Sequence, residues 1–86
     1  MKNLRTFTVH GTATGDDKSI QLDEISIIAD SETMRALGNF LINAADEMAQ
    51  FGLEHLHLQD LVENFSHETH VDIIALNREI IEISNE

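Results

Sequence analysis

The sequence predicts an α+β fold in the order β-β-α-β-β, with a single antiparallel-rich sheet of four to five strands covered on one face by one long helix. Three observations support this prediction. Only one stretch, residues 31–52, repeats apolar residues at three- and four-residue steps, which is typical of an amphipathic helix. Short segments in which apolar and polar residues alternate lie before and after this stretch, and turn residues separate them. The chain has 86 residues, so we expect one domain, residues 1–86.

The predicted helix begins at Ser31 and ends at Gly52. Asp30 or Ser31 can cap its start, because a short side-chain oxygen accepts a hydrogen bond from a free N–H of the first turn. Glu32 places a negative charge near the positive end of the helix dipole. Gly52 ends the helix, since it enters the left-handed conformation without a Cβ clash. The apolar stripe comprises Met34, Leu37, Gly38, Leu41, Ala44, Ala45 and Met48.

The first strand is predicted over residues 4–14, with Phe7 and Val9 on one face and threonines on the other. A turn at residues 15–18, Gly-Asp-Asp-Lys, leads into a hairpin partner over residues 19–29.

Within the second strand, the alternation changes parity at Asp23 and Glu24. A bulge there would bring both sets of apolar residues to one face. The alternative is a strand that begins only near Glu24.

After the helix, residues 53–60 alternate as a strand, with Leu56 and Leu58 on one face and the intervening histidines on the other. Residues 60–70 show no period and are expected to form a loop or a short helical turn.

Residues 71–76 are apolar except for Asp72 and are a candidate central strand. Residues 79–83 follow Asn77 and Arg78 as either a fifth strand or a terminal helical turn, and the short pattern leaves both open.

Charge is the most informative bulk property. Sixteen acidic residues against five basic ones give a net charge of −11. Residues 1–43 carry four basic and six acidic residues, a net of −2, whereas residues 44–86 carry one and ten, a net of −9. Such a chain repels nucleic acid and anionic lipid, and it attracts basic proteins. Solubility alone is the competing explanation for the charge.

The amino-acid composition excludes several classes of protein and of metal site. The chain has no cysteine, so disulfide scaffolds and thiolate metal sites are excluded. No apolar run is long enough to span a bilayer, and no hydrophobic segment follows the two basic residues of the start. The expected location is therefore the cytoplasm.

No catalytic constellation is apparent, and we expect no enzyme, no cofactor and no metal. His55 and His57 could share a metal on one strand face, but solvent-facing strand histidines are commoner than metal sites. His67 and His70 are three residues apart, whereas the zinc-protease helix needs four. Ser66 lacks the surroundings of a nucleophile elbow.

The acidic residues of the second half suggest a surface for a basic partner, although an ordinary solvated face is the simpler alternative. With the strand histidines, the candidate partner-binding set is Asp46, Glu47, Glu54, His55, His57, Asp60, Glu63 and Glu68.

The helix and the segment after it carry a family resemblance. The pieces are Arg-Ala-Leu-Gly-Asn-Phe-Leu at 35–41, Ala-Ala-Asp-Glu-Met at 44–48, His-Leu-His-Leu-Gln-Asp at 55–60 and Val-Asp-Ile-Ile-Ala-Leu at 71–76. Together they resemble the Immunity protein 32 family of bacterial polymorphic toxin systems over residues 24–77. The residues of the strand motif that match are His55, His57 and Asp60.

The resemblance implies a cytoplasmic protein that binds and blocks a cognate toxin domain and is not itself an enzyme. The toxin is expected to be basic and a nuclease, with the acidic surface standing in for nucleic acid. The alternative is a self-associating structural or regulatory module, so a homodimer remains open. No nucleic-acid or membrane partner is expected.

Overall fold

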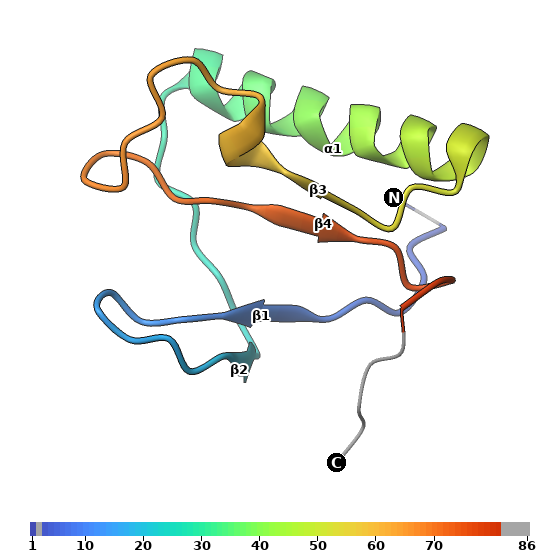
Figure 1. Ribbon diagram of the computed structural model, residues 1–86, viewed down its shortest axis with the longest axis horizontal. Coiled ribbons are helices and arrows are strands. Elements are labelled where there is room, and N and C mark those ends of the chain that lie inside the picture. The colour runs from blue at the N-terminus through green and yellow to red at the C-terminus, as the bar shows by residue number, and fades with distance from the viewer. Residues whose placement is uncertain (2, 82–86) are drawn as a thin grey trace.

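The computed structural model describes Met1 and residues 3–81 and confirms the α+β class and the order of the elements (Figure 1). One long helix lies along the pair of strands that follows it in the chain, and the first hairpin lies on the other side of that pair. The elements are β1 (Val9–Gly11), β2 (Ile20–Leu22), α1 (Ser31–Phe51), β3 (His55–His57), a 3₁₀ turn (Leu58–Asp60) and β4 (Ile74–Leu76).

The predicted single sheet is wrong, because the four strands form two separate antiparallel pairs, β1–β2 and β3–β4. Each strand has only three residues, so each pair is a short ladder. Within the described residues, β4 pairs with β3 alone, so the predicted central strand is an edge strand. The fold is therefore two hairpin-like pairs with one helix.

The second strand ends early for a local reason. The expectation was a strand over residues 19–29 with a bulge at Asp23 and Glu24, or a start near Glu24. Instead β2 ends at Leu22, and the chain bends at Asp23 and runs irregularly to the helix. The change of parity in the sequence thus marks where the chain leaves the ladder, since a bend removes the following residues from pairing altogether.

The first turn is confirmed, although it lies slightly earlier than expected. Asp16 N donates to Ala13 O at 2.9 Å, and Gly15 takes a φ of 82°. The Asp16 carboxylate then accepts from Lys18 N at 3.1 Å. These local bonds join β1 to β2 in the register Val9 opposite Leu22 and Gly11 opposite Ile20.

The helix boundaries are confirmed at both ends. Asp30 is the N-cap, and its Oδ1 accepts from Thr33 N at 2.8 Å. This hydrogen bond from the Thr33 backbone holds the pKa of the Asp30 carboxyl below its ordinary value. The cap therefore contributes fully above the unfolded-state pKa and is lost as the pH falls through the lower folded-state pKa.

At the other end, Gly52 adopts the left-handed conformation, with φ 63° and ψ 34°, and donates to Met48 O at 3.1 Å. We expect Gly52→Ala to lower the free energy of unfolding by about 1 kcal/mol, because a Cβ disfavours this conformation. Gly38→Ala is the matched control. It lies inside α1 with open space around the added Cβ, and should raise stability by up to about 1 kcal/mol. Urea unfolding followed by circular dichroism measures both, and a destabilised Gly38→Ala or a neutral Gly52→Ala would contradict the assignment.

The predicted apolar stripe of α1 is confirmed in part. Ala44 is buried at 2% exposure, and Leu37 and Met48 are partly buried, but Leu41 is 55% exposed. The stripe leaves out Phe40, which is 5% exposed, because it runs through the neighbouring residue Leu41 instead. The helix thus packs its Phe40 side inward, and Met34 remains 43% exposed.

The end of the described chain favours the helical-turn alternative over a fifth strand. Ile80 N and Ile81 N both donate to Asn77 O at 3.1 Å, which is turn geometry. Residues 79–81 accordingly form no strand, and residues 82 and 83 of the open prediction lie outside the described residues.

Candidate functional site

A histidine–carboxylate pair ties β3 to the segment that leads into β4. His57 Nδ1 lies 2.8 Å from Asp72 Oδ2, and the other oxygen, Oδ1, accepts from Gln59 N at 2.9 Å. Both side chains are partly buried, at 31% exposure for His57 and 18% for Asp72. The carboxylate therefore orients the imidazole and holds the start of the 3₁₀ turn at the same time.

Asp72 was missed as a site residue, although the sequence contained its signal. It is the one polar residue in the apolar run 71–76. A carboxylate in such a run requires a partner when it is buried, and His57 with Gln59 N supplies it.

We expect Asp72→Ala to lower the free energy of unfolding by about 1–3 kcal/mol, because Gln59 N–H and the His57 ring lose their partner. Asp60→Ala is the control, since Asp60 is an exposed carboxylate of the adjoining turn and should change stability by less than about 0.5 kcal/mol. Asp72→Asn keeps an oxygen for Gln59 N and should fall between them. Urea unfolding ranks the stability of the three variants. An Asp72→Ala protein as stable as Asp60→Ala would show that the His57–Asp72 pair does not stabilise the fold.

The two histidines of β3 lie side by side as expected, with ring centroids 5.4 Å apart in an edge-on arrangement. His55 is exposed, and its Nδ1 lies 3.5 Å from Glu54 Oε1. Among the described residues, no group of three or more histidine, aspartate or glutamate side chains is placed to hold a metal ion. The carboxylate of Asp72 thus holds the His57 ring, whereas among the described residues His55 makes no side-chain hydrogen bond.

The predicted partner-binding residues do not form one patch. Figure 1 shows that the end of α1 leads into the start of β3, while the loop after β3 returns toward the start of α1. One group therefore lies where α1 exits, and the other lies beyond the far end of β3. The first group is Asp46, Glu47 and Glu54, and the second is Asp60, Glu63 and Glu68, with His55 and His57 between them.

All these carboxylates except one are exposed. Glu47 is half-buried, and its backbone carbonyl accepts from Leu53 N at 3.5 Å. It is therefore part of the helix end, whereas the other five acidic side chains can meet a partner directly. In the part of the chain that the structure describes, no lysine or arginine forms a salt bridge with any of them.

Asn77 is the buried polar residue that holds the start of β3 to the end of β4. It is 8% exposed, its Nδ2 donates to Leu53 O at 3.0 Å, and its Oδ1 accepts from Glu79 N at 3.0 Å. Its own backbone N donates to Glu54 O at 2.8 Å. The exit of α1, near which Asp46, Glu47 and Glu54 lie, is thus held to the end of β4 by a side-chain and a backbone hydrogen bond of Asn77.

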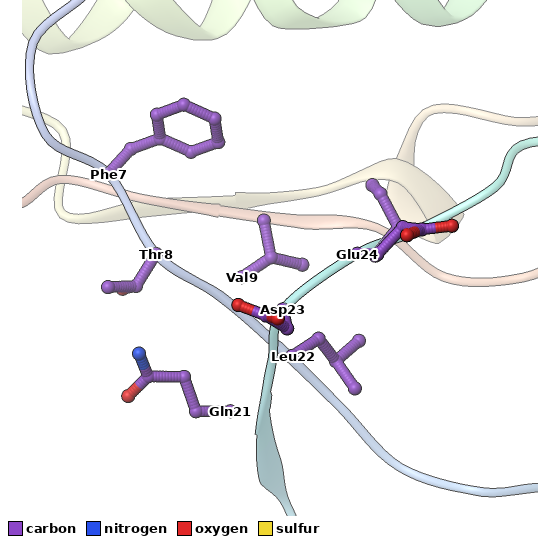
Figure 2. A pocket seen from close by; sticks show the side chains of 8 residues that line it. Phe7, Thr8, Val9, Gln21, Leu22, Asp23 and Glu24 are labelled. Carbon is purple, nitrogen blue, oxygen red and sulfur yellow. The ribbon is translucent and has the colours of Figure 1, made fainter.

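A pocket of about 380 Å³ lies in the fork where β1 and β2 separate (Figure 2). The β1–β2 ladder ends at Val9 opposite Leu22. The bend at Asp23 then directs the residues after β2 away from the residues that precede β1. Figure 2 shows Phe7 and Val9 directed toward the side on which α1 lies, and Thr8 directed away from it. No motif in the sequence predicts this pocket, because it forms where the segments that flank β1 and β2 diverge.

A larger apolar space of about 1,480 Å³ separates the hairpin from α1 and β4. It is lined by side chains from all three, including Val9, Leu37, Phe40 and Ile74. Thr8 Oγ1 and Arg78 Nη2 approach to 3.4 Å across this side of the molecule. The hairpin is therefore joined to the rest of the fold by sparse contacts.

Comparison with known sequences places most of the chain in one family pattern. The sequence model described as Immunity protein 32 matches residues 24–79, which include α1, β3 and β4. No curated protein and no solved structure matches the chain. In the described residues, no helix has the length and apolarity that a membrane crossing requires.

Proposed function

Because this chain belongs to the Immunity protein 32 family, we propose that it binds a cognate bacterial toxin domain in the cytoplasm and neutralises it without enzymatic activity of its own. The family match over residues 24–79 carries the proposal, since it covers the helix and the β3–β4 pair. The proposed partner is a basic domain, and a nuclease is the class whose groove suits this chain, because a nuclease groove must attract an anionic substrate.

Charge supports the mode of inhibition. Residues 44–86 hold ten of the sixteen acidic residues and a single arginine. The exposed carboxylates among them present negative charge in the way that a phosphate backbone does, so the protein can occupy the groove in place of nucleic acid. Complementary charge also raises the rate of association, and this contribution weakens as salt screens it.

The two acidic groups make the proposal specific. The two groups lie at opposite ends of β3, so a toxin groove can contact one acidic group without the other. Three double variants separate the possibilities at equal change in net charge: Asp46→Asn with Glu54→Gln, Glu63→Gln with Glu68→Gln, and Asp16→Asn with Asp17→Asn as the control in the distant hairpin turn.

The experiment is calorimetric titration of the toxin domain encoded beside this gene with each variant, at low and at high salt. We expect at least one of the first two variants to weaken binding by tenfold or more, a loss of about 1.4 kcal/mol, and the loss to shrink in high salt. Affinity that ignores salt and all three variants would reject electrostatic binding by these residues. Failure of the wild-type protein to bind or inhibit the toxin would reject the function itself.

Self-association is the second candidate, and one observation favours it. Several large apolar side chains are exposed, among them Ile28 at 97%, Val71 at 76% and Phe51 at 75%. Exposed apolar surface is typical of interaction sites. Light scattering on the purified protein decides the question: a stable dimer at micromolar concentration supports self-association, and a monomer opposes it.

A further inference from the structure

We propose that the fork between β1 and β2 is a second contact with the toxin and that it receives an arginine side chain of that basic partner. The inference rests on the proposed function, because it takes the basic toxin as the occupant. It adds a site in the first half of the chain, away from the acidic residues of the second half.

The lining of the fork suits the two parts of an arginine side chain. Phe7, Val9 and Leu22 supply apolar surface for its aliphatic stem. Asp23 and Glu24 also line the fork, and a guanidinium donates to a single carboxylate through two parallel hydrogen bonds. A lysine ammonium makes no such paired contact, so arginine is the better occupant.

The two carboxylates are available for a partner. Both are exposed, and within the described residues neither Asp23 nor Glu24 takes part in a side-chain hydrogen bond or a salt bridge. Arg78 donates to Thr8 Oγ1 at 3.4 Å. Among the described residues, no lysine or arginine lines the pocket.

The size and the exposure of the fork also fit an anchor contact. Its volume of about 380 Å³ lies at the small end of the range for binding pockets, about 300–1,000 Å³. Phe7 is 62% exposed, so a docked side chain would cover apolar surface that is now in water. Arginine is among the residues that most often dominate the energy of a protein interface.

Most of the fork lies outside the residues that the family model matches. The match begins at Glu24, so Phe7 through Asp23 are supplied by the part of the chain in front of it.

The first test uses a probe that does not depend on the toxin. Acetyl-arginine-amide and acetyl-citrulline-amide are titrated into the ¹⁵N-labelled protein and followed by NMR at the amides of Thr8, Gln21 and Glu24. Citrulline has the same shape as arginine without its charge. We expect saturable shifts with arginine and at least fivefold smaller shifts with citrulline, a ratio that corresponds to an electrostatic preference. Equal shifts, or none at these amides, would overturn the proposal.

The second test uses the toxin and a matched pair of variants. Asp23→Asn with Glu24→Gln should weaken toxin binding by tenfold or more, whereas Asp16→Asn with Asp17→Asn, in the turn of the same hairpin, should change it less than twofold. NMR spectra confirm that both variants fold. If the two variants lose affinity equally, the fork is not a contact even though the toxin binds. If the wild type fails to bind the toxin while the fork still prefers arginine, the proposed function fails and the pocket stands.

Discussion

Replacement of Phe40 by alanine is expected to lower the free energy of unfolding by about 3 kcal/mol or more, because it leaves a cavity at the larger of the two buried apolar residues. Phe40 and Ala44 are the buried apolar residues among those described, and Phe40 is much the larger. A small domain has a total stability of only about 5–15 kcal/mol. The alanine variant should therefore unfold partly at 37 °C.

The matched control is Phe51→Ala. It removes the same side chain from the same helix, but Phe51 is 75% exposed, so the loss should be less than about 0.5 kcal/mol. Thermal unfolding followed by circular dichroism at 222 nm compares them. Equal losses would show that α1 buries a different face.

Replacement of Asn77 by alanine is the second large effect, with an expected loss of about 1–3 kcal/mol. The change removes the partners of Leu53 O and Glu79 N, and both of these hydrogen bonds are part-buried, so water can satisfy the two groups in part. Because Asn77 joins the exit of α1 to the end of β4, hydrogen exchange at Glu54 N and its neighbours should also accelerate.

Two variants locate the cause of this loss. Asn77→Asp retains an oxygen for Glu79 N but removes the donor to Leu53 O, so it should remain clearly destabilised. Asn43→Ala removes an exposed asparagine from α1 and should change stability by less than about 0.5 kcal/mol. Chemical unfolding measures the stability of both variants. A neutral Asn77→Ala would mean that water replaces the hydrogen bonds of the Asn77 side chain without loss of stability.

Local features of the chain were predictable because their causes lie within a few residues. Asp30 and Gly52 bound the helix through their own side chain and backbone, and Gly15 and Asp16 form the first turn in the same way. The histidine pair of β3 follows from alternation alone.

The candidate site was less predictable, because its contacts join distant parts of the chain. The structure separates the acidic residues into two groups, since β3 extends the chain between Glu54 and Asp60. The sequence predicts a solvent-facing His57, but its hydrogen-bond partner is Asp72, fifteen residues away. The fork between β1 and β2 depends on where the ladder stops, which no spacing of residue types encodes.

By itself, then, the sequence determined the class of the fold, the order of its elements, both ends of α1 and the resemblance to a family that the comparison confirms over residues 24–79. Only the tertiary structure decided that the strands form two pairs, that Phe40 is the inward residue of α1 and that Asp72 and Asn77 hold β3 in place. The physical reason is the separation along the sequence over which each kind of interaction acts. Caps, turns and periodicity are properties of neighbouring residues, whereas pairing, burial and the partners of buried polar groups depend on which distant segments meet.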